Sequence, residues 1–304
     1  MVAALSVRFV PESHADLGHK HFDTFGAVTV TGGLMLLVYA LTKAPQYGWG
    51  DERTIGMLVA SAVILGAFLW NERRSKHPLV PLSIFTTKNV GKANLVMFPM
   101  IAAMFAMFFF LTLYVQNILG YEPFKTGLAF FPVAIVIGIV AGISSNLVTK
   151  IGYKPLLVLG PLLVGAGLFW LGFIPVHGEY LTNVLPPLVT IAAGMGMSFV
   201  GGTIGATNGV APKDSGLASG LFNTTGQVGG ALGLAILSAV ASSATKHSIE
   251  NAIATGQIDP QAALVDGFHA AFFVGAGLGL LGSLIALFWI KQPKGEKIKP
   301  TMGV

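Results

Sequence analysis

The chain has 304 residues, of which 53% are hydrophobic and only 10% are charged, and it contains no cysteine. A soluble domain carries about 25% charged residues, so this composition excludes an ordinary soluble fold, and the lack of cysteine excludes disulfides and thiolate sites. The net charge of +5 would suit a nucleic-acid partner, but the basic residues lie between apolar stretches, so no nucleic acid is expected.

Eight apolar stretches are each long enough to cross a bilayer, for which about 20 helical residues suffice. In chain order they cover residues 24–43, 54–71, 91–116, 126–149, 155–175, 183–209, 216–241 and 268–290. Backbone groups in lipid must be satisfied within the segment, and these stretches are too long for barrel strands. The predicted fold class is therefore all-α, a polytopic protein with eight transmembrane helices in the lipid bilayer.

The breaks between the spans define the predicted domains. Residues 1–23 hold a short apolar piece interrupted by Arg8, which is typical of the last turns of a helix or of an interfacial N-terminus. A cytoplasmic linker at 72–90 separates two helices from six. The predicted order is a start at 1–23, a helix pair at 24–71, the linker at 72–90, a six-helix bundle at 91–290 and a basic tail at 291–304.

The longest break on the other side lies at residues 242–267 and contains Glu250, Asp259 and Asp266. Its polar composition predicts a loop that carries a short surface helix. This loop and the linker are the two longest interruptions of the apolar pattern.

The basic residues predict the orientation of the spans. Fourteen of the eighteen Lys and Arg residues fall on one side, and the other four are Lys43, Arg53, Lys125 and Lys246. Basic residues mark the cytoplasmic loops of membrane proteins. We therefore expect a multi-pass protein of the cell membrane with both termini in the cytoplasm.

The acidic residues argue against an enzyme. Catalysis inside a membrane needs ionisable groups at depth, whereas all thirteen Asp and Glu residues lie at span ends or between spans. Asp23, the acid closest to a span, opens the first one, where a helix-capping role is favoured. No catalytic residue, metal site or cofactor is expected.

Neutral polar residues do enter the spans. An amide in lipid either bonds to another helix or lines a watered cavity, and both roles stay open here. Asn223 and Gln227 are four residues apart and share one helix face, so for this pair a cavity role is about as well supported as a bond to another helix. The amides in the interior of the predicted spans include Asn94, Gln116, Asn146, Asn208, Asn223 and Gln227.

Two apolar patterns also bear on function. Residues 99–115 are rich in Met and Phe and include Phe105 and Phe109, a composition found at promiscuous sites but also in plain core or lipid-facing helices. Glycines at four-residue spacing predict close helix packing. They are Gly138 and Gly142; Gly201, Gly205 and Gly209; Gly216 and Gly220; Gly226 and Gly230; Gly229 and Gly233; and Gly275 and Gly279.

Several stretches, in order, give the chain a family resemblance. They are RFVPES before FDTFGAVTVTGGLMLLVYAL, then YGWG, HPLVPLSIF, LYVQNILGYEPFKTGLAFFP and APKDSGLASGLFNTTGQVGGALGLAIL. Over nearly its whole length the chain resembles the fourteen-helix drug:proton antiporters of the major facilitator superfamily. In that family two six-helix bundles flank an inserted helix pair. The resemblance thus implies a partial fold, with the inserted pair at 24–71 and the C-terminal bundle at 91–290, and without the N-terminal bundle.

The resemblance implies export of lipophilic, often cationic small molecules. It implies a substrate-facing surface that draws on Asn94, Phe105, Phe109, Asn208, Asn223 and Gln227. The family's proton-coupling acids lie largely in the N-terminal bundle, so the chain is expected to be inactive without that missing half. The alternative is a non-transporting remnant, or a scaffold half that pairs with a separately encoded N-terminal half.

A cytoplasmic loop signature of the family, roughly G-x-x-x-D-R/K-x-G-R/K-K, is similar to LVTKIGYKP in this chain. Lys150, Gly152 and Lys154 match it. Thr149 stands at the acid position and Tyr153 at one basic position. These two departures weigh against the conformational charge lock that the family resemblance would otherwise imply for this loop.

Overall fold

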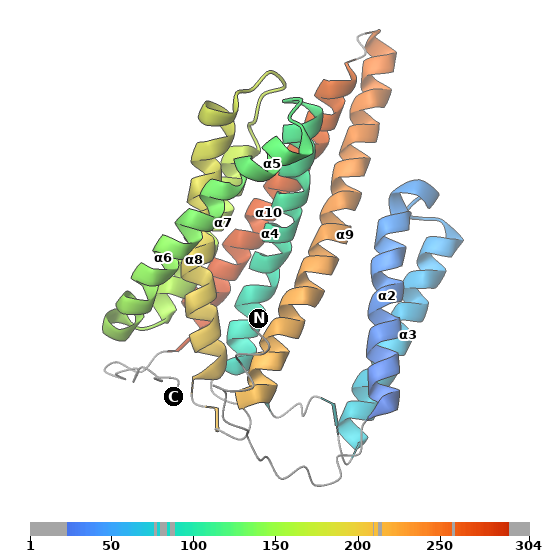
Figure 1. Cartoon of the computed structure of the whole chain (residues 1–304). Coiled ribbons are helices and arrows are strands. Elements are labelled where there is room, and N and C mark those ends of the chain that lie inside the picture. The colour runs from blue at the N-terminus through green and yellow to red at the C-terminus, as the bar shows by residue number, and fades with distance from the viewer. Residues whose placement is uncertain are drawn as a thin grey trace.

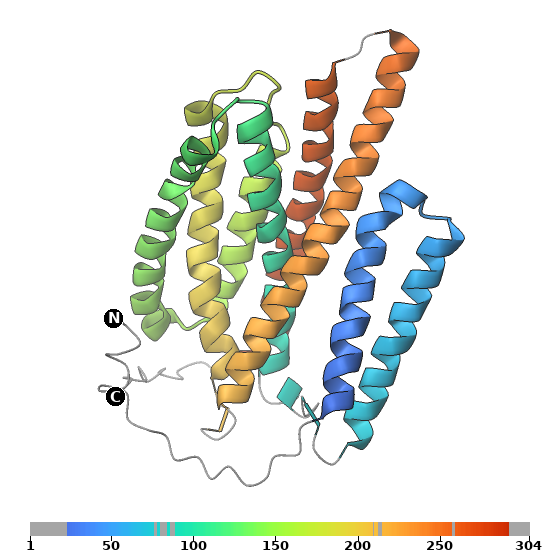
Figure 2. The same cartoon turned by 45° about the vertical axis from the view of Figure 1, so that its right-hand side comes forward.

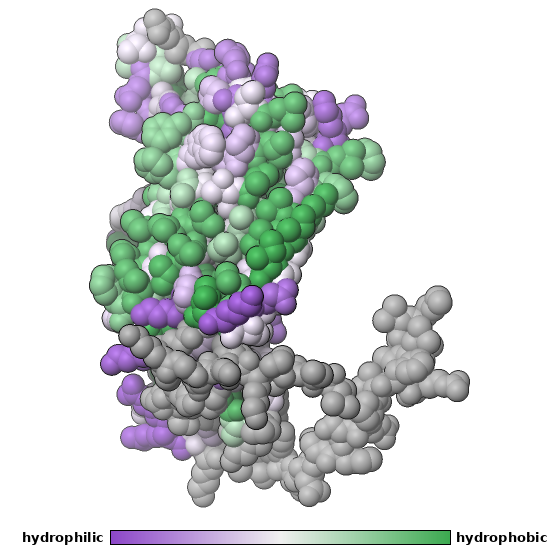
Figure 3. All heavy atoms as spheres, turned by 90° about the vertical axis from the view of Figure 1, so that its left-hand side faces the viewer, coloured by the Kyte–Doolittle hydropathy of each residue, from purple (hydrophilic) through white to green (hydrophobic). Residues whose placement is uncertain are grey.

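The computed structural model describes residues 23–75, 78–79, 84–85, 89–208, 210–211, 215–256 and 259–291. Within these residues the fold is all-helical, and eight helical segments are long and apolar enough to cross a membrane, which confirms the predicted fold class (Figure 1). An apolar belt between two hydrophilic ends is visible on one face of the molecule (Figure 3). The predicted helix remnant in 1–22 and the tail from residue 292 lie outside the described residues.

Two helices form a hairpin beside the rest, α2 (Thr24–Tyr47) and α3 (Glu52–Arg74). The Asp23 carboxylate accepts hydrogen bonds from the Gly26 backbone N–H at 2.8 Å and from Asn71 Nδ2 at 2.7 Å. The predicted capping role of Asp23 is confirmed, and the same side chain also joins the start of α2 to the last turn of α3.

The other helices form one bundle (Figure 2). They are α4 (Val90–Asn117), α5 (Pro123–Ala129), α6 (Phe131–Ile151), α7 (Lys154–Leu171), the π-helical turn η2 (Tyr180–Val184), α8 (Leu185–Thr207), α9 (Ser215–Thr255) and α10 (Pro260–Trp289). The most deeply buried is α4, which packs on α9 and α10. The α7 helix packs between α8 and α10, and α6 lies against α8. The helix pair reaches the bundle through the contact of α2 with α9.

Glycines let three helix pairs approach to backbone distance. A Cβ added at Gly279 of α10 would lie 2.7 Å from Gly165 Cα of α7, and one at Gly194 of α8 would lie 2.5 Å from the Gly160 carbonyl oxygen of α7. At Gly233 of α9 it would lie within 2.4 Å of the Ala102 Cα of α4. At each of these crossings the backbones of the two helices are therefore in direct van der Waals contact.

The prediction for residues 242–267 is wrong. The α9 helix runs without a break to Thr255, and α10 begins at Pro260, so two extended helices replace the predicted loop and surface helix. Hydropathy falls after residue 241, but residues 242–255 contain no Gly or Pro that would break a helix, and the left-handed conformation that ends α9 comes at Gly256, with φ +70°. Ser248 of α9 donates a hydrogen bond to Asp266 of α10 at 2.6 Å, which ties the two extensions together.

Candidate functional site

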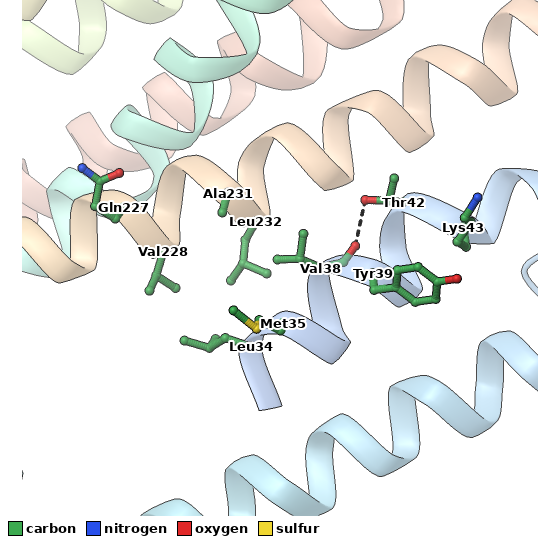
Figure 4. Close-up of a pocket in the computed structure, with 10 residues that line it drawn as sticks. All are labelled: Leu34, Met35, Val38, Tyr39, Thr42, Lys43, Gln227, Val228, Ala231 and Leu232. Carbon is green, nitrogen blue, oxygen red and sulfur yellow. Dashed lines mark hydrogen bonds between the residues drawn. The ribbon is translucent and has the colours of Figure 1, made fainter. Parts of the chain in front are cut away.

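The polar face predicted on α9 lies at the surface. Asn223 and Gln227 are both exposed, one turn apart. Gln227 follows Gly226, which faces Ile101 of α4, and together with Val228 it lines a groove shared with α2 (Figure 4). The face that carries these two amides thus runs along α9 between its contact with α4 and its contact with α2.

The two predicted phenylalanines of α4 are partly exposed, with 38% of Phe105 and 42% of Phe109 accessible. The ring of Phe105 packs on α9 at Gly230, where an added Cβ would lie 2.8 Å from the ring. Gly230 is three residues beyond Gln227. The structure therefore brings Phe105 to the same stretch of α9 as the amide pair, and Phe109 follows one turn further along α4.

The other two predicted residues lie elsewhere. Asn94 is buried in the first turns of α4, where its Nδ2 donates to the Val90 carbonyl oxygen at 2.8 Å and its Oδ1 has no hydrogen-bond partner among the described residues. Asn208 is half-buried and ends α8, where its backbone N–H donates to the Ile204 carbonyl oxygen at 2.8 Å. Neither joins the exposed group. A substrate-binding role stays a prediction for all six residues.

The turn between α6 and α7 is only two residues long. Lys150 is exposed in the last turn of α6, and Lys154 is the first residue of α7. Gly152 has φ +82° and ψ 179°, a conformation that is almost confined to glycine, and its N–H donates to the Val148 carbonyl oxygen at 2.9 Å. Lys150 and Lys154 therefore lie on either side of a backbone bend at Gly152. This bend requires glycine, which is the third residue that matches the loop signature.

Tyr153, which departs from the loop signature, is buried, with 2% of its surface accessible. Asn89 Nδ2 donates to the Tyr153 hydroxyl oxygen at 2.6 Å and to the Lys291 carbonyl oxygen at 3.0 Å. This neutral network joins the start of α4, the start of α7 and the end of α10. Sequence reasoning missed it because the partners are 64 and 202 residues apart, and the tyrosine at a basic position was its one visible sign.

Gly152→Ala is expected to destabilise the folded chain by about 1–3 kcal/mol, because an L side chain is strained in this backbone conformation. Denaturant unfolding in detergent, followed by circular dichroism, measures the change. Gly138→Ala is the matched control, since Gly138 lies inside α6 and an added Cβ meets nothing within 4 Å. Equal stability of the two variants would contradict this role of Gly152.

Comparison with known proteins finds relatives that are named as export or resistance proteins. The cephamycin export protein CmcT of Amycolatopsis lactamdurans is 36% identical over 233 residues, which cover 76% of this chain and 48% of that protein. The puromycin resistance protein pur8 of Streptomyces alboniger is 32% identical over 296 residues, which cover 95% of this chain and 58% of that protein. The tetracenomycin C resistance and export protein of Streptomyces glaucescens is 27% identical, with 98% of this chain and 61% of that protein covered.

The chain thus spans 48% to 61% of the length of these relatives. The sequence model of the Major Facilitator Superfamily matches residues 22–234, which is more than half of the chain. This is a family of membrane transporters and not of enzymes, and it agrees with the eight apolar helices. The chain therefore belongs to the major facilitator superfamily.

Proposed function

We propose that this chain is part of a proton-coupled efflux transporter for lipophilic or cationic small molecules, and that it is inactive alone. Two of the relatives above are named as export proteins and two as resistance proteins. In this proposal the chain lies in the cell membrane with both termini in the cytoplasm, and an N-terminal six-helix half completes it.

The observation that carries the proposal is a pair of glycine faces without a neighbouring helix. A Cβ added at Gly138 or Gly142 of α6, or at Gly216 or Gly220 of α9, meets nothing within 4 Å among the described residues. The glycines of α9 beyond residue 225, in contrast, pack on α4. Small residues at this spacing allow close helix approach, so these two faces suit packing against helices of another half.

The acidic residues support dependence on a partner. Within the residues that the structure describes, every Asp and Glu lies near a helix end, in a turn or in the extended part of α9. A proton taken through the bilayer needs a titratable group at depth. In the proposed transporter these groups come from the N-terminal half.

The test is reconstitution with and without an N-terminal half taken from the puromycin resistance protein. Uptake of a fluorescent lipophilic cation into inverted vesicles is measured with and without a proton gradient. The chain alone is expected to match protein-free vesicles, and the co-purified pair to show uptake that a proton ionophore abolishes. Robust uptake by the chain alone would contradict the proposal that it is inactive without an N-terminal half. A stable pair without uptake would favour the non-transporting scaffold.

A further inference from the structure

The contact of α2 with α9 encloses an apolar groove of about 570 Å³ (Figure 4). Its walls include Leu34 and Val38 of α2, and Val228 and Leu232 of α9. The two helices meet around this groove, which lies where the helix pair joins the bundle. An elongated apolar group would fill it better than water, because water would find few polar partners there.

One end of the groove carries a positive charge. Lys43 lies at the end of α2 that the basic-residue pattern places outside, and its Nζ donates to Gln46 Oε1 at 3.0 Å. Within the described residues no carboxylate lies in ion-pair range of this ammonium group. The hydroxyl of Thr42, also at this end, donates a hydrogen bond to the Val38 carbonyl oxygen at 2.8 Å. The Lys43 end of the groove therefore carries a positive charge that no carboxylate of the described residues neutralises, next to walls that are mostly apolar.

The length of the groove matches one leaflet of a bilayer. Leu34 and Lys43 are nine residues apart on α2, which is a rise of about 14 Å. Half of the hydrocarbon core is about 15 Å thick. Lys43 is thus about one leaflet away from the inner end of the groove, where Leu34, Val228 and the amide of Gln227 lie (Figure 4).

We propose that this groove binds one anionic phospholipid, with an acyl chain between α2 and α9 and its phosphate on Lys43. The apolar walls recognise the chain, and the unpaired ammonium group selects the negative charge against zwitterionic or cationic amphiphiles. This site goes beyond the proposed transport function, and it shares one lining residue, Gln227, with the predicted substrate-binding surface. The lipid would fix the helix pair to the bundle by filling their common contact.

The test is native mass spectrometry of the full chain, released from detergent after incubation with phosphatidylglycerol or phosphatidylcholine of equal chain length. One phosphatidylglycerol per chain is expected to be retained in preference to phosphatidylcholine. Lys43→Gln is expected to lower this preference about fivefold, as befits one basic residue near a membrane surface. Lys125→Gln is the control, because that exposed lysine lies over the Tyr121 ring, at 3.8 Å, and does not line the groove. Equal retention of both lipids, or an equal loss in both variants, would overturn the proposal.

A second measurement locates the acyl chain without a substitution. A phosphatidylglycerol with a photoreactive diazirine on its acyl chain is irradiated with the wild-type protein, and the crosslinked peptides are mapped. Crosslinks concentrated at residues 34–43 and 227–232 are expected. Crosslinks spread evenly over all lipid-facing helices, with α6 labelled as strongly as α9, would refute the site.

Discussion

Gly279→Leu is expected to prevent the bundle from closing, whereas Gly277→Leu leaves it folded. A Cβ at Gly279 would lie 2.7 Å from the backbone nitrogen and Cα of Gly165 and 2.9 Å from the Pro161 carbonyl oxygen. These are backbone atoms, so no side-chain rotation can make room. Overpacking costs up to about 3 kcal/mol even where a core adjusts, and separating α7 from α10 would add the loss of their other contacts.

The control tests position and not merely volume. Gly277 lies on the same helix, and a Cβ added there meets nothing within 4 Å of the described residues. Size-exclusion chromatography in detergent and the denaturant midpoint of unfolding measure the outcome. If both variants elute as a single folded species with similar midpoints, the close α7–α10 crossing does not hold the bundle together.

The second large effect is expected on assembly and not on folding. Replacing Gly138 and Gly142 together by Leu should leave the stability of the chain unchanged, because both positions are open. The same double variant should no longer co-purify with the N-terminal half, because two leucines would keep a partner helix from approaching α6.

An affinity tag on the N-terminal half measures the recovered fraction of this chain. Gly32→Leu is the matched control, since Gly32 is an exposed glycine of α2 that also meets nothing within 4 Å. Wild-type recovery of the α6 double variant would show that a partner binds elsewhere. Reduced recovery of both variants would indicate a general effect of added bulk.

Hydropathy predicted the existence of all eight spans because the bilayer imposes one length on each of them. It could not predict where α9 ends, since the residues after 241 leave the apolar pattern without leaving the helix. A polar segment without Gly or Pro is compatible with a loop or with a solvated helix. Among the described residues, the left-handed Gly256 and the Asp259 cap of α10 mark the actual turn.

The spacing of glycines predicted which faces could pack, but not which faces do. Gly229 and Gly233 lie against α4, while a Cβ added at Gly138 or Gly142, which share the same spacing, meets nothing within 4 Å among the described residues. The difference depends on which helix is a neighbour, and this is a property of tertiary structure. For the same reason the sequence did not distinguish the buried Asn94 from the exposed Asn223. Equivalent amides on two apolar helices have no local feature that reveals their surroundings.

The length of α9 has a mechanical consequence. Its 41 residues extend about 61 Å, roughly twice the hydrocarbon thickness of a bilayer. The end of α9 at Thr255 lies 22 residues, or about 33 Å, from the close crossing with α4 at Gly233. A rotation of α9 by about 5° around that crossing would move the tip by about 3 Å. Because Ser248 and Asp266 join α9 to α10, the ends of both helices would move together. A spin label at this tip would therefore report a displacement larger than that of the helices near the crossing.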